Sequence, residues 1–201
     1  LDIGENKLER IDPAICNHTS LTSLSLSCNQ IEALPEEIGN MRQLENLHLQ
    51  LNNITDLPEN IGKLQRLRQL LLSSNKISKL DEHITRLSRL QNLALDGNSI
   101  KKLPEGLSQL ESLKILTLHD NALTSLPDDF GQLTSLEQLD LDGNYFTDTP
   151  PQLAQLRKLK GFDLGQQNSA ENDTDSPAEE LAIEEQRRRE MALAEQMEIH
   201  Q

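Results

Sequence analysis

The chain has 201 residues, a formal net charge of −14 and only 2% aromatic residues. Leucine occurs 39 times, whereas valine does not occur at all. The strands of β-sandwiches and of parallel-sheet enzymes usually draw on valine and aromatic residues, so the composition disfavours both classes. The negative charge would repel nucleic acid and an acidic membrane leaflet, and we expect neither as a partner.

A leucine-rich template recurs along the chain. The pattern LxxLxLxxNxI starts at a constant spacing of 23 residues, without an insertion, at Leu21, Leu44, Leu67, Leu90, Leu113 and Leu136. Its ninth position forms an asparagine ladder of seven residues, Asn6, Asn29, Asn52, Asn75, Asn98, Asn121 and Asn144. Self-similarity at such a fixed period is the signature of a leucine-rich-repeat array.

Each column of the template has a physical role. The LxL segment predicts a short strand whose leucines point into a core shared with the neighbouring coils. Stacked strands form a parallel sheet with a spacing of about 4.8 Å, and the asparagine offers a donor and an acceptor to the turn that leaves the strand. The predicted fold is therefore α/β, a leucine-rich-repeat solenoid. We expect a curved right-handed superhelix with parallel short strands on its concave face and short helical or 3-10 turns on its convex face.

A proline and several acidic residues follow the second apolar column of most coils. The prolines in register are Pro35, Pro58, Pro104, Pro127 and Pro150. Proline suits the first position of a helix, where no backbone donor is lost, and acids there lie near the positive end of the helix. We interpret as structural the acidic column Glu36, Glu37, Glu59, Glu105, Asp128 and Asp129.

Three segments of different composition divide the chain. Residues 1–165 form about seven coils, and Leu1 falls in the middle of a repeat, so we expect a truncated first coil and a fragment of a longer protein. Residues 166–177 are polar and acidic, which predicts a flexible linker. Residues 178–201 are rich in helix-forming residues and predict a charged C-terminal helix. The sequence leaves three alternatives for this helix: it is exposed to solvent, it docks on another surface, or it dimerises. The oligomeric state also stays open.

No motif predicts catalysis. The sequence lacks a glycine-rich phosphate-binding loop and a histidine pair at i and i+4. Asp140–Asn144 resembles the start of a calcium loop, but Tyr145 and Pro151 stand where glycine and glutamate are required. We therefore expect no enzymatic activity, no cofactor and no metal.

The cysteines and the apolar runs bear on the cellular location. No apolar run approaches the roughly 18 residues that a membrane helix needs, and no signal peptide is visible. The two cysteines, Cys16 and Cys28, are too few for a disulfide framework, so we interpret them as reduced thiols. The sequence thus predicts a cytoplasmic protein.

The outward-pointing positions of successive strands predict one open face, the concave face. Its candidate protein-binding residues are His48, Gln50, Leu71, Asp96, Thr117, His119, Asp140, Asp142 and Asp163. The first half is small and neutral around an exposed Leu71, whereas the second half is acidic. An open sheet with varied outward residues suits a wide protein surface. We predict that this face binds a partner protein, with the aspartates selecting a basic one.

The register also gathers five cations at one side of the array, the basic flank. Its residues are Lys63, Arg66, Arg68, Arg86 and Arg89. One interpretation is a set of solvated loop charges. The other is a site for an acidic peptide or for the acidic tail of this chain folding back.

Three convex segments carry a resemblance to a known group. The segments LPEEIGNMRQL, LPENIGKLQRL and LPDDFGQLTSL resemble those of the intracellular Ras-group leucine-rich-repeat proteins, the class of Scribble, Erbin and the Ras-suppressor proteins. The resemblance implies a non-enzymatic scaffold in intracellular signalling, with a small GTPase or a phosphatase as partner. The alternative is the substrate-recognition arm of a larger enzyme (a ubiquitin ligase, kinase or cyclase) whose catalytic domain lies outside this sequence.

Overall fold

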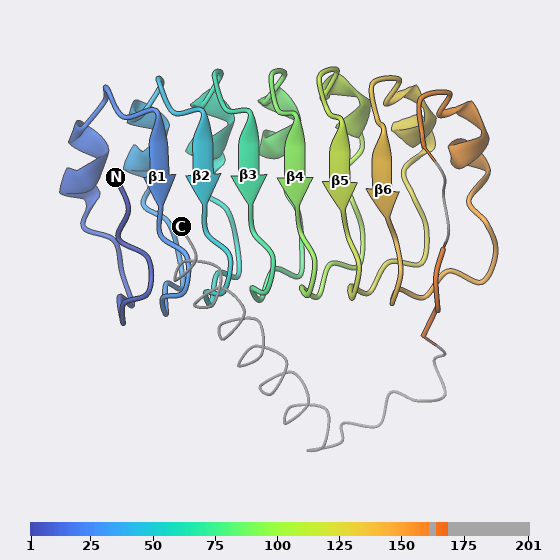
Figure 1. The fold of residues 1–201 in the computed structure, drawn as a ribbon, viewed down its shortest axis with the longest axis horizontal. Helices are drawn as coiled ribbons and strands as arrows, with labels where there is room; N and C mark the ends of the chain where they lie inside the picture. Colours follow the sequence, from blue (N-terminus) through green and yellow to red (C-terminus); the bar gives the residue numbers. More distant parts are fainter. Residues whose placement is uncertain (161–163, 169–201) are drawn as a thin grey trace, which may run out of the picture. The chain divides into compact units, whose positions relative to one another are not determined.

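The structure is a computed structural model and describes residues 1–160 and 164–168. Six short strands lie side by side in one parallel sheet, in chain order, with β1 and β6 at its edges (Figure 1). The strands are β1 (Ser23–Ser25), β2 (Asn46–His48), β3 (Gln69–Leu71), β4 (Asn92–Ala94), β5 (Ile115–Thr117) and β6 (Gln138–Asp140). An isolated bridge between Asp2 and Ser25 continues the pairing before β1.

Short 3-10 helices alternate with the strands and lie on the other side of each coil (Figure 1). In the described part of the chain they are η1 (Pro13–Asn17), η2 (Glu36–Asn40), η3 (Glu59–Lys63), η4 (Glu82–Arg86), η5 (Leu107–Gln109), η6 (Asp128–Gln132) and η7 (Pro151–Gln155). The residue after each helix donates its N–H three residues back, as Met41 does to the Ile38 carbonyl at 3.1 Å. This bond closes the helix and turns the chain toward the next strand.

The core lies between the strands and the helices. Each strand pairs with the next in the register of the repeat, so that Leu47 pairs with Leu70 and Leu70 with Leu93. The inward strand positions are all buried, namely Leu24, Leu47, Leu70, Leu93, Leu116 and Leu139. Burying one leucine contributes about 2 kcal/mol, and the column repeats this gain in every coil. Leucine serves here without valine because each strand is three residues long and packing sets its side-chain position.

The asparagine ladder provides hydrogen-bond partners for the backbone of the turns that follow the strands. Asn52 donates from Nδ2 to the carbonyls of Leu26 and Leu49, both at 3.0 Å, and its Oδ1 accepts from the Ile31 N–H at 3.0 Å. The same pattern repeats at Asn29, Asn75, Asn98, Asn121 and Asn144. Two bonds of each set, one donated by Nδ2 and one accepted by Oδ1, reach the previous coil, so the ladder ties consecutive coils together.

The last described coil uses a longer amide for the same purpose. Gln167 takes the ladder position, where its Oε1 accepts from the Phe146 N–H at 2.9 Å and its Nε2 donates to the Leu141 carbonyl at 3.0 Å. Asn6 in the first coil is exposed, and its side chain bonds only the carbonyls of Ile3 and Gly4. The ladder bonds between coils therefore run from Asn29 to Gln167.

The prolines of the convex segments do not occupy the position that the sequence suggested. Pro35, Pro58 and Pro127 lie at the N-cap, one residue before the helix, with extended backbone. The expectation of a first helical position is wrong for these three, because the proline carbonyl accepts the first helical bond, from the Ile38 N–H in the case of Pro35. It is also wrong for Pro150, the N-cap residue of η7, and for Pro104, which precedes η5 without being part of it.

The acidic column connects neighbouring coils as well as helix ends. Glu36 lies in the first turn of η2, and its carboxylate accepts from the backbone N–H groups of Glu59 at 3.3 Å and Asn60 at 3.1 Å in the next coil. Asp129 Oδ2 accepts from the Ser108 N–H at 2.9 Å. These bonds agree with the structural interpretation of the acids.

The eighth template position bends the backbone in every described coil from the first to the seventh. Its φ angle is positive at Glu5, Cys28, Leu51, Ser74, Gly97, Asp120 and Gly143. Glycine adopts this left-handed conformation freely, whereas other residues adopt it at a cost, so the surrounding ladder must hold the turn in place. The conformation of the turn is therefore set by its place in the coil and not by the type of residue.

The prediction of a leucine-rich-repeat solenoid is confirmed by the single parallel sheet and the convex 3-10 turns. Residues Leu1–Asn168 form one compact unit. The predicted helix over 178–201 lies outside the described residues, as does the predicted linker 166–177 beyond Asn168. In the described part of the chain, no helix has the length and hydropathy that crossing a bilayer requires.

Candidate functional site

The outward side of the sheet carries three columns of side chains. The middle column is Ser25, His48, Leu71, Ala94, Thr117 and Asp140. The second column lies two residues after the end of each strand and consists of Ser27, Gln50, Ser73, Asp96, His119 and Asp142. The backbone there continues the hydrogen bonding between coils. Both columns agree with the register that the sequence predicted.

The third column was missed by the sequence reasoning. It lies at the first strand position and consists of Ser23, Asn46, Gln69, Asn92, Ile115 and Gln138. Residues two apart in a strand point to the same side, so the alternation that gave the other two columns could have found it. The concave face is therefore one column wider than predicted.

Leu71, in the neutral half of the concave face, is less exposed than the sequence suggested. Leu71 is half-buried, because His48 and Ala94 flank it in the sheet register, so the prediction of an exposed Leu71 is wrong. His48 Nε2 lies 3.0 Å from Gln69 Oε1, and this hydrogen bond joins the middle column to the third column. Gln50 Oε1 is buried and has no hydrogen-bond partner among the described residues.

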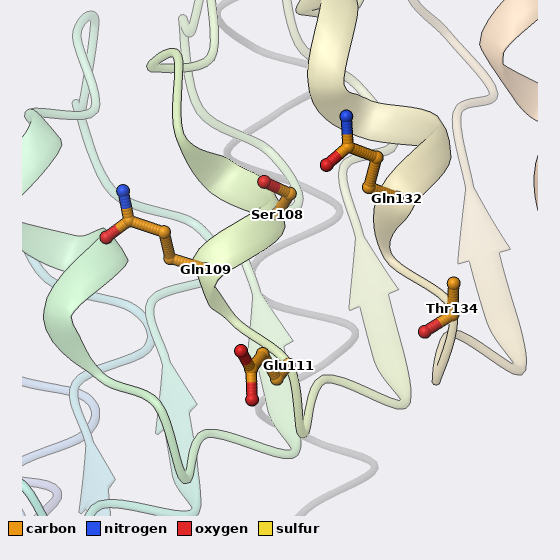
Figure 2. A pocket seen from close by; sticks show the side chains of 5 residues that line it. All are labelled: Ser108, Gln109, Glu111, Gln132 and Thr134. Atoms are coloured by element: carbon orange, nitrogen blue, oxygen red, sulfur yellow. The ribbon is translucent and has the colours of Figure 1, made fainter.

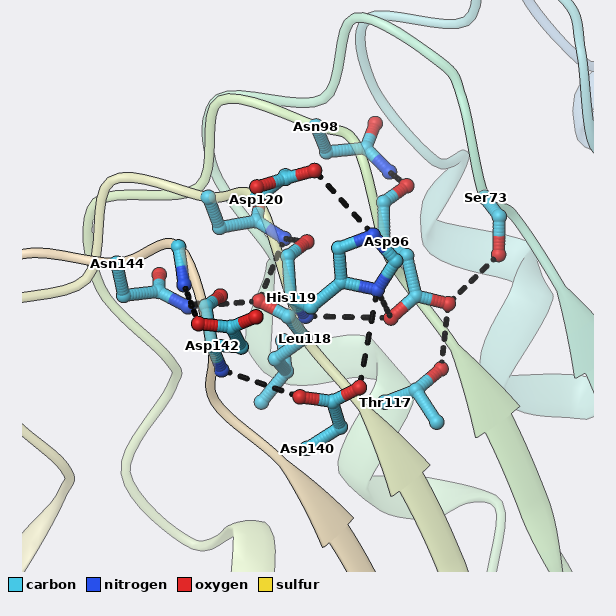
Figure 3. Close-up of polar contacts among 12 residues, drawn as sticks. Ser73, Asp96, Asn98, Thr117, Leu118, His119, Asp120, Asp140, Asp142 and Asn144 are labelled. Carbon is cyan, nitrogen blue, oxygen red and sulfur yellow. Dashed lines mark hydrogen bonds and ion pairs between the residues drawn. The ribbon is translucent and has the colours of Figure 1, made fainter. Parts of the chain in front are cut away.

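The acidic half is centred on His119, which lies among three carboxylates (Figure 3). Its Nδ1 is 3.4 Å from Asp96 Oδ1 and 3.8 Å from Asp140 Oδ2, and its Nε2 is 3.3 Å from Asp120 Oδ2. Both ring nitrogens thus face an acceptor. An imidazolium, which donates from both nitrogens, fits this arrangement.

Asp96 is the structural anchor of this cluster. Its side chain is only 18% exposed, and it accepts from Thr117 Oγ1 at 2.6 Å, from Ser73 Oγ at 3.1 Å and from the His119 N–H at 3.2 Å. Thr117 lies in β5 and His119 follows it, whereas Ser73 follows β3 (Figure 3). Asp96 therefore orients His119 and offers little free carboxylate to a partner protein.

The charges of the cluster shift its protonation. The hydrogen bond to Asp96 raises the pKa of His119 from 6.5 to about 9, against the effect of burial and with help from Asp120 and Asp140. Burial acts to raise the pKa of Asp96, but the hydrogen bonds from His119 and Thr117 outweigh it and keep that pKa below its usual value. At neutral pH the cluster consequently holds one imidazolium against three carboxylates and stays negative.

Three aspartates of this half reach solvent. The side chains of Asp120 and Asp140 are 59% and 46% exposed, and Asp142 is also exposed. Asp142 Oδ1 accepts from the Gly143 N–H at 3.0 Å and from the Gln166 N–H at 2.5 Å, which fixes its orientation. Asp120 belongs to the acidic half, although it lies at the turn position outside the strand alternation. The predicted Asp163 lies outside the described residues.

The basic flank lies where the chain leaves the helices η3 and η4 and approaches β3 and β4. All five of its residues are exposed. Arg68 Nε lies 3.6 Å from Glu45 Oε2, whereas the other four cations make no ion pair within the described residues. The register therefore brings together the cations that the sequence grouped.

Elsewhere the described residues offer little chemistry. A shallow hollow at η5 and η6 is lined by Ser108, Gln109, Glu111, Gln132 and Thr134, of which Glu111 alone is charged (Figure 2). Burial raises the pKa of the Cys28 thiol, which makes it a poor nucleophile. No group of three or more metal-ligating side chains is arranged for an ion in the residues that the structure describes.

Comparisons with known proteins agree with this architecture. The leucine-rich repeat region family matches residues 59–182, and a second leucine-rich repeat family matches residues 19–77. The first match spans more than half of the chain, so the chain belongs to the leucine-rich-repeat family. Such repeats generally mediate protein–protein interaction. No curated protein sequence matched the chain.

Two solved structures share the fold over most of the chain. A leucine-rich-repeat protein of Leptospira interrogans is 34% identical with a TM-score of 0.79, and the match covers 81% of this chain and 42% of that protein. A plant peptide hormone receptor, RGFR1 in complex with RGF2, is 29% identical with a TM-score of 0.71, and the match covers 79% of this chain and 26% of the receptor. The chain thus spans less than half the length of either protein.

Proposed function

We propose that the chain is a non-enzymatic scaffold that binds a partner protein through its concave face. The observation that carries this proposal is the continuous outward surface of three side-chain columns, with a neutral half around Leu71 and an acidic half around His119. A solved relative of the fold, the plant receptor, is described as a complex with a peptide hormone. The surface supports binding of a partner with an apolar or neutral segment followed by a basic one.

The chemistry of the acidic half specifies how a basic partner is selected. Asp120 and Asp142 are exposed, the Asp140 side chain is 46% exposed, and the orientation of Asp142 is held by backbone N–H groups. Prearranged carboxylates attract an arginine or lysine side chain and accelerate the encounter. The protonated His119 lies between the carboxylates and reduces their mutual repulsion.

The test replaces charge on the concave face and measures binding directly. A partner is captured with the full chain, identified, purified and titrated by calorimetry against the double variant Asp140→Lys, Asp142→Lys. We expect the affinity to fall at least about tenfold, because two attractions become repulsions. The matched control, Glu37→Lys with Glu105→Lys, reverses two exposed convex charges and should keep the affinity within about twofold. Equal affinities for all three proteins would exclude the concave face.

The cellular role rests on the resemblance to the Ras-group proteins. We propose an intracellular, cytoplasmic signalling scaffold with a small GTPase or a phosphatase as partner, and the free thiols of Cys16 and Cys28 support a reducing location. Purified small GTPases and phosphatase catalytic subunits are the first proteins to titrate. The alternative, a substrate-recognition arm of a larger enzyme, would use the same face, and the full open reading frame distinguishes the two.

A further inference from the structure

We propose that the basic flank is a second interaction surface, separate from the concave face, and that it binds an acidic peptide segment of a partner protein. The flank joins the ends of η3 and η4, which carry Lys63 and Arg86, to the turns that carry Arg66 and Arg89. Two adjacent coils therefore present two cations each at equivalent positions.

The stems of two cations are seated by glycines of the preceding coil. A Cβ atom on Gly39 would lie 3.2 Å from Lys63 Cδ, and one on Gly62 would lie 3.0 Å from Arg86 Cδ. The aliphatic stems thus lie against bare backbone, while both residues remain exposed. A long side chain packed along its stem loses less conformational freedom when its charged head binds an anion.

Gln65 fixes the spacing between the two coils that carry these cations. Its Nε2 donates to the Gly62 carbonyl at 2.7 Å and to the Arg86 carbonyl at 3.0 Å, so it ties the turn of one coil to the helix end of the next. Neighbouring coils in a parallel sheet are separated by about 4.8 Å. The flank therefore presents its cations as a preformed, closely spaced group.

The charges of this group are not neutralised by the described part of the protein. Glu45 pairs with Arg68, and the other four cations have no ion-pair partner among the described residues. Equivalent positions of adjacent coils are separated by less than the Debye length of about 8 Å, so like charges there repel one another and an anion between them is favoured. Guanidinium groups also match carboxylates in two-point hydrogen bonding, which favours an acidic peptide over a simple counterion.

The limited width of the flank favours a short acidic segment over a long polyanion. The same positions hold Asn40 and Gln43 in the coil before and Gln109 and Ser112 in the coil after. A nucleic-acid duplex carries a negative charge about every 1.7 Å and would extend onto a chain whose net charge is −14. A membrane surface meets the same repulsion. A segment of a few alternating carboxylates spans the two coils without reaching beyond them.

The experiment measures binding of a fluorescein-labelled peptide in which glutamate alternates with serine, by anisotropy at low salt with the full chain. The flank variant carries Lys63→Gln, Arg66→Gln, Arg86→Gln and Arg89→Gln. We expect its affinity to be at least about tenfold weaker than that of the wild type, with a loss of binding as salt is raised. A matched variant with the same charge change carries Lys76→Gln, Lys79→Gln, Lys101→Gln and Lys102→Gln, and it should bind within about twofold of the wild type.

Several outcomes would overturn the proposal. Equal losses in both variants would mean that net charge alone governs binding, and equal binding of a peptide with glutamine in place of glutamate would remove the role of carboxylates. Tighter binding of duplex DNA or of phosphatidylserine vesicles would assign the flank to another class of partner. Peptide binding seen only after the acids of residues 169–201 are changed to amides would identify this chain as the source of the acidic segment.

The flank and the concave face are tested independently. Asp140→Lys with Asp142→Lys changes the concave face and should leave peptide binding at the flank within about twofold. A chain that binds its partner normally but not the acidic peptide would retain the proposed function and lose this inference. The reverse result would retain the flank and lose the concave face.

Discussion

Asn75 makes four hydrogen bonds with one buried side chain. Its Nδ2 donates to the carbonyls of Leu72 at 2.9 Å, Leu49 at 3.0 Å and Ser73 at 3.4 Å, and its Oδ1 accepts from the Ile54 N–H at 3.0 Å. Replacing it by alanine leaves a buried donor and several acceptors without partners. We expect Asn75→Ala to lower the free energy of unfolding by about 3 kcal/mol, measured by urea denaturation.

Asn6 is the matched control for this prediction. It has the same template position, but it is exposed, and its side chain bonds only two carbonyls of its own coil. Water can replace these bonds, so Asn6→Ala should cost less than about 1 kcal/mol. Equal costs for the two variants would show that coil-to-coil bonding is not what the ladder contributes.

His119 should couple stability to pH. Its pKa is about 9 in the folded chain and 6.5 as the ordinary value, so the protonated ring stabilises the fold. That contribution is complete below pH 6.5 and is lost as the pH rises through about 9. In thermal unfolding, the stability difference between the wild type and His119→Gln should therefore shrink between these pH values.

An NMR titration gives the direct measurement of the same group. The imidazole resonances absent from the His119→Gln spectrum identify His119, and we expect their midpoint near 9. Asp96→Asn removes the largest cause of the shift and should move the midpoint down toward 6.5. A midpoint near 6.5 in the wild type would contradict the ion pairs around the ring.

Gly62 shows how the helical elements of neighbouring coils are spaced. A Cβ atom there would lie 2.8 Å from the His83 carbonyl and 3.0 Å from Arg86 Cδ. Alanine is the better helix former by about 1 kcal/mol, but a clash with a backbone carbonyl forces the coils apart. We expect Gly62→Ala to destabilise the chain by about 2 kcal/mol in chemical denaturation.

Thr85 occupies the same register one coil later and is the control. In the coil that follows Thr85, Gly106 takes the position of His83. Its φ of 80° redirects the backbone before the shorter helix η5, so the Thr85 side chain fits. Thr85 Oγ1 donates to the Glu82 carbonyl at 2.8 Å, and Thr85→Ala should cost about 1 kcal/mol for this bond. A more stable Gly62→Ala protein would show that the coils adjust freely.

The elements differ in how far the sequence predicts them. The strands and the columns of the concave face follow from the period of 23 residues and from strand alternation, since register alone sets side-chain direction. The left-handed turns at Cys28 and Leu51 could not be predicted from residue type, because neither favours that conformation. The partial burial of Leu71 depends on side chains of the adjacent coils, which a one-coil template does not contain. The contacts of His119 with Asp120 and Asp140 likewise depend on the turn geometry.

At the scale of the molecule, the compact unit Leu1–Asn168 is a stack in which each coil contacts its neighbours. Stability in such a stack is a sum of coil terms and nearest-neighbour interfaces. The sheet ladder, the asparagine ladder and the core all repeat with the same register. The repeat length, and not any one residue, is therefore what the fold requires.

Removal of one whole coil tests this requirement. Deletion of residues 67–89 joins Arg66 to Leu90, so the template continues in register with one strand and one 3-10 helix fewer. We expect a folded protein with cooperative urea unfolding and a lower free energy of unfolding, because one interface is lost.

The matched deletion of residues 67–78 removes about half a coil and places core positions of β4 out of register with β2. A slip in register turns core leucines toward solvent, so this variant should lose its circular-dichroism signal and its cooperative transition. If both deletions unfold cooperatively with similar midpoints, the coils are not interchangeable units and the nearest-neighbour description of the stack is wrong.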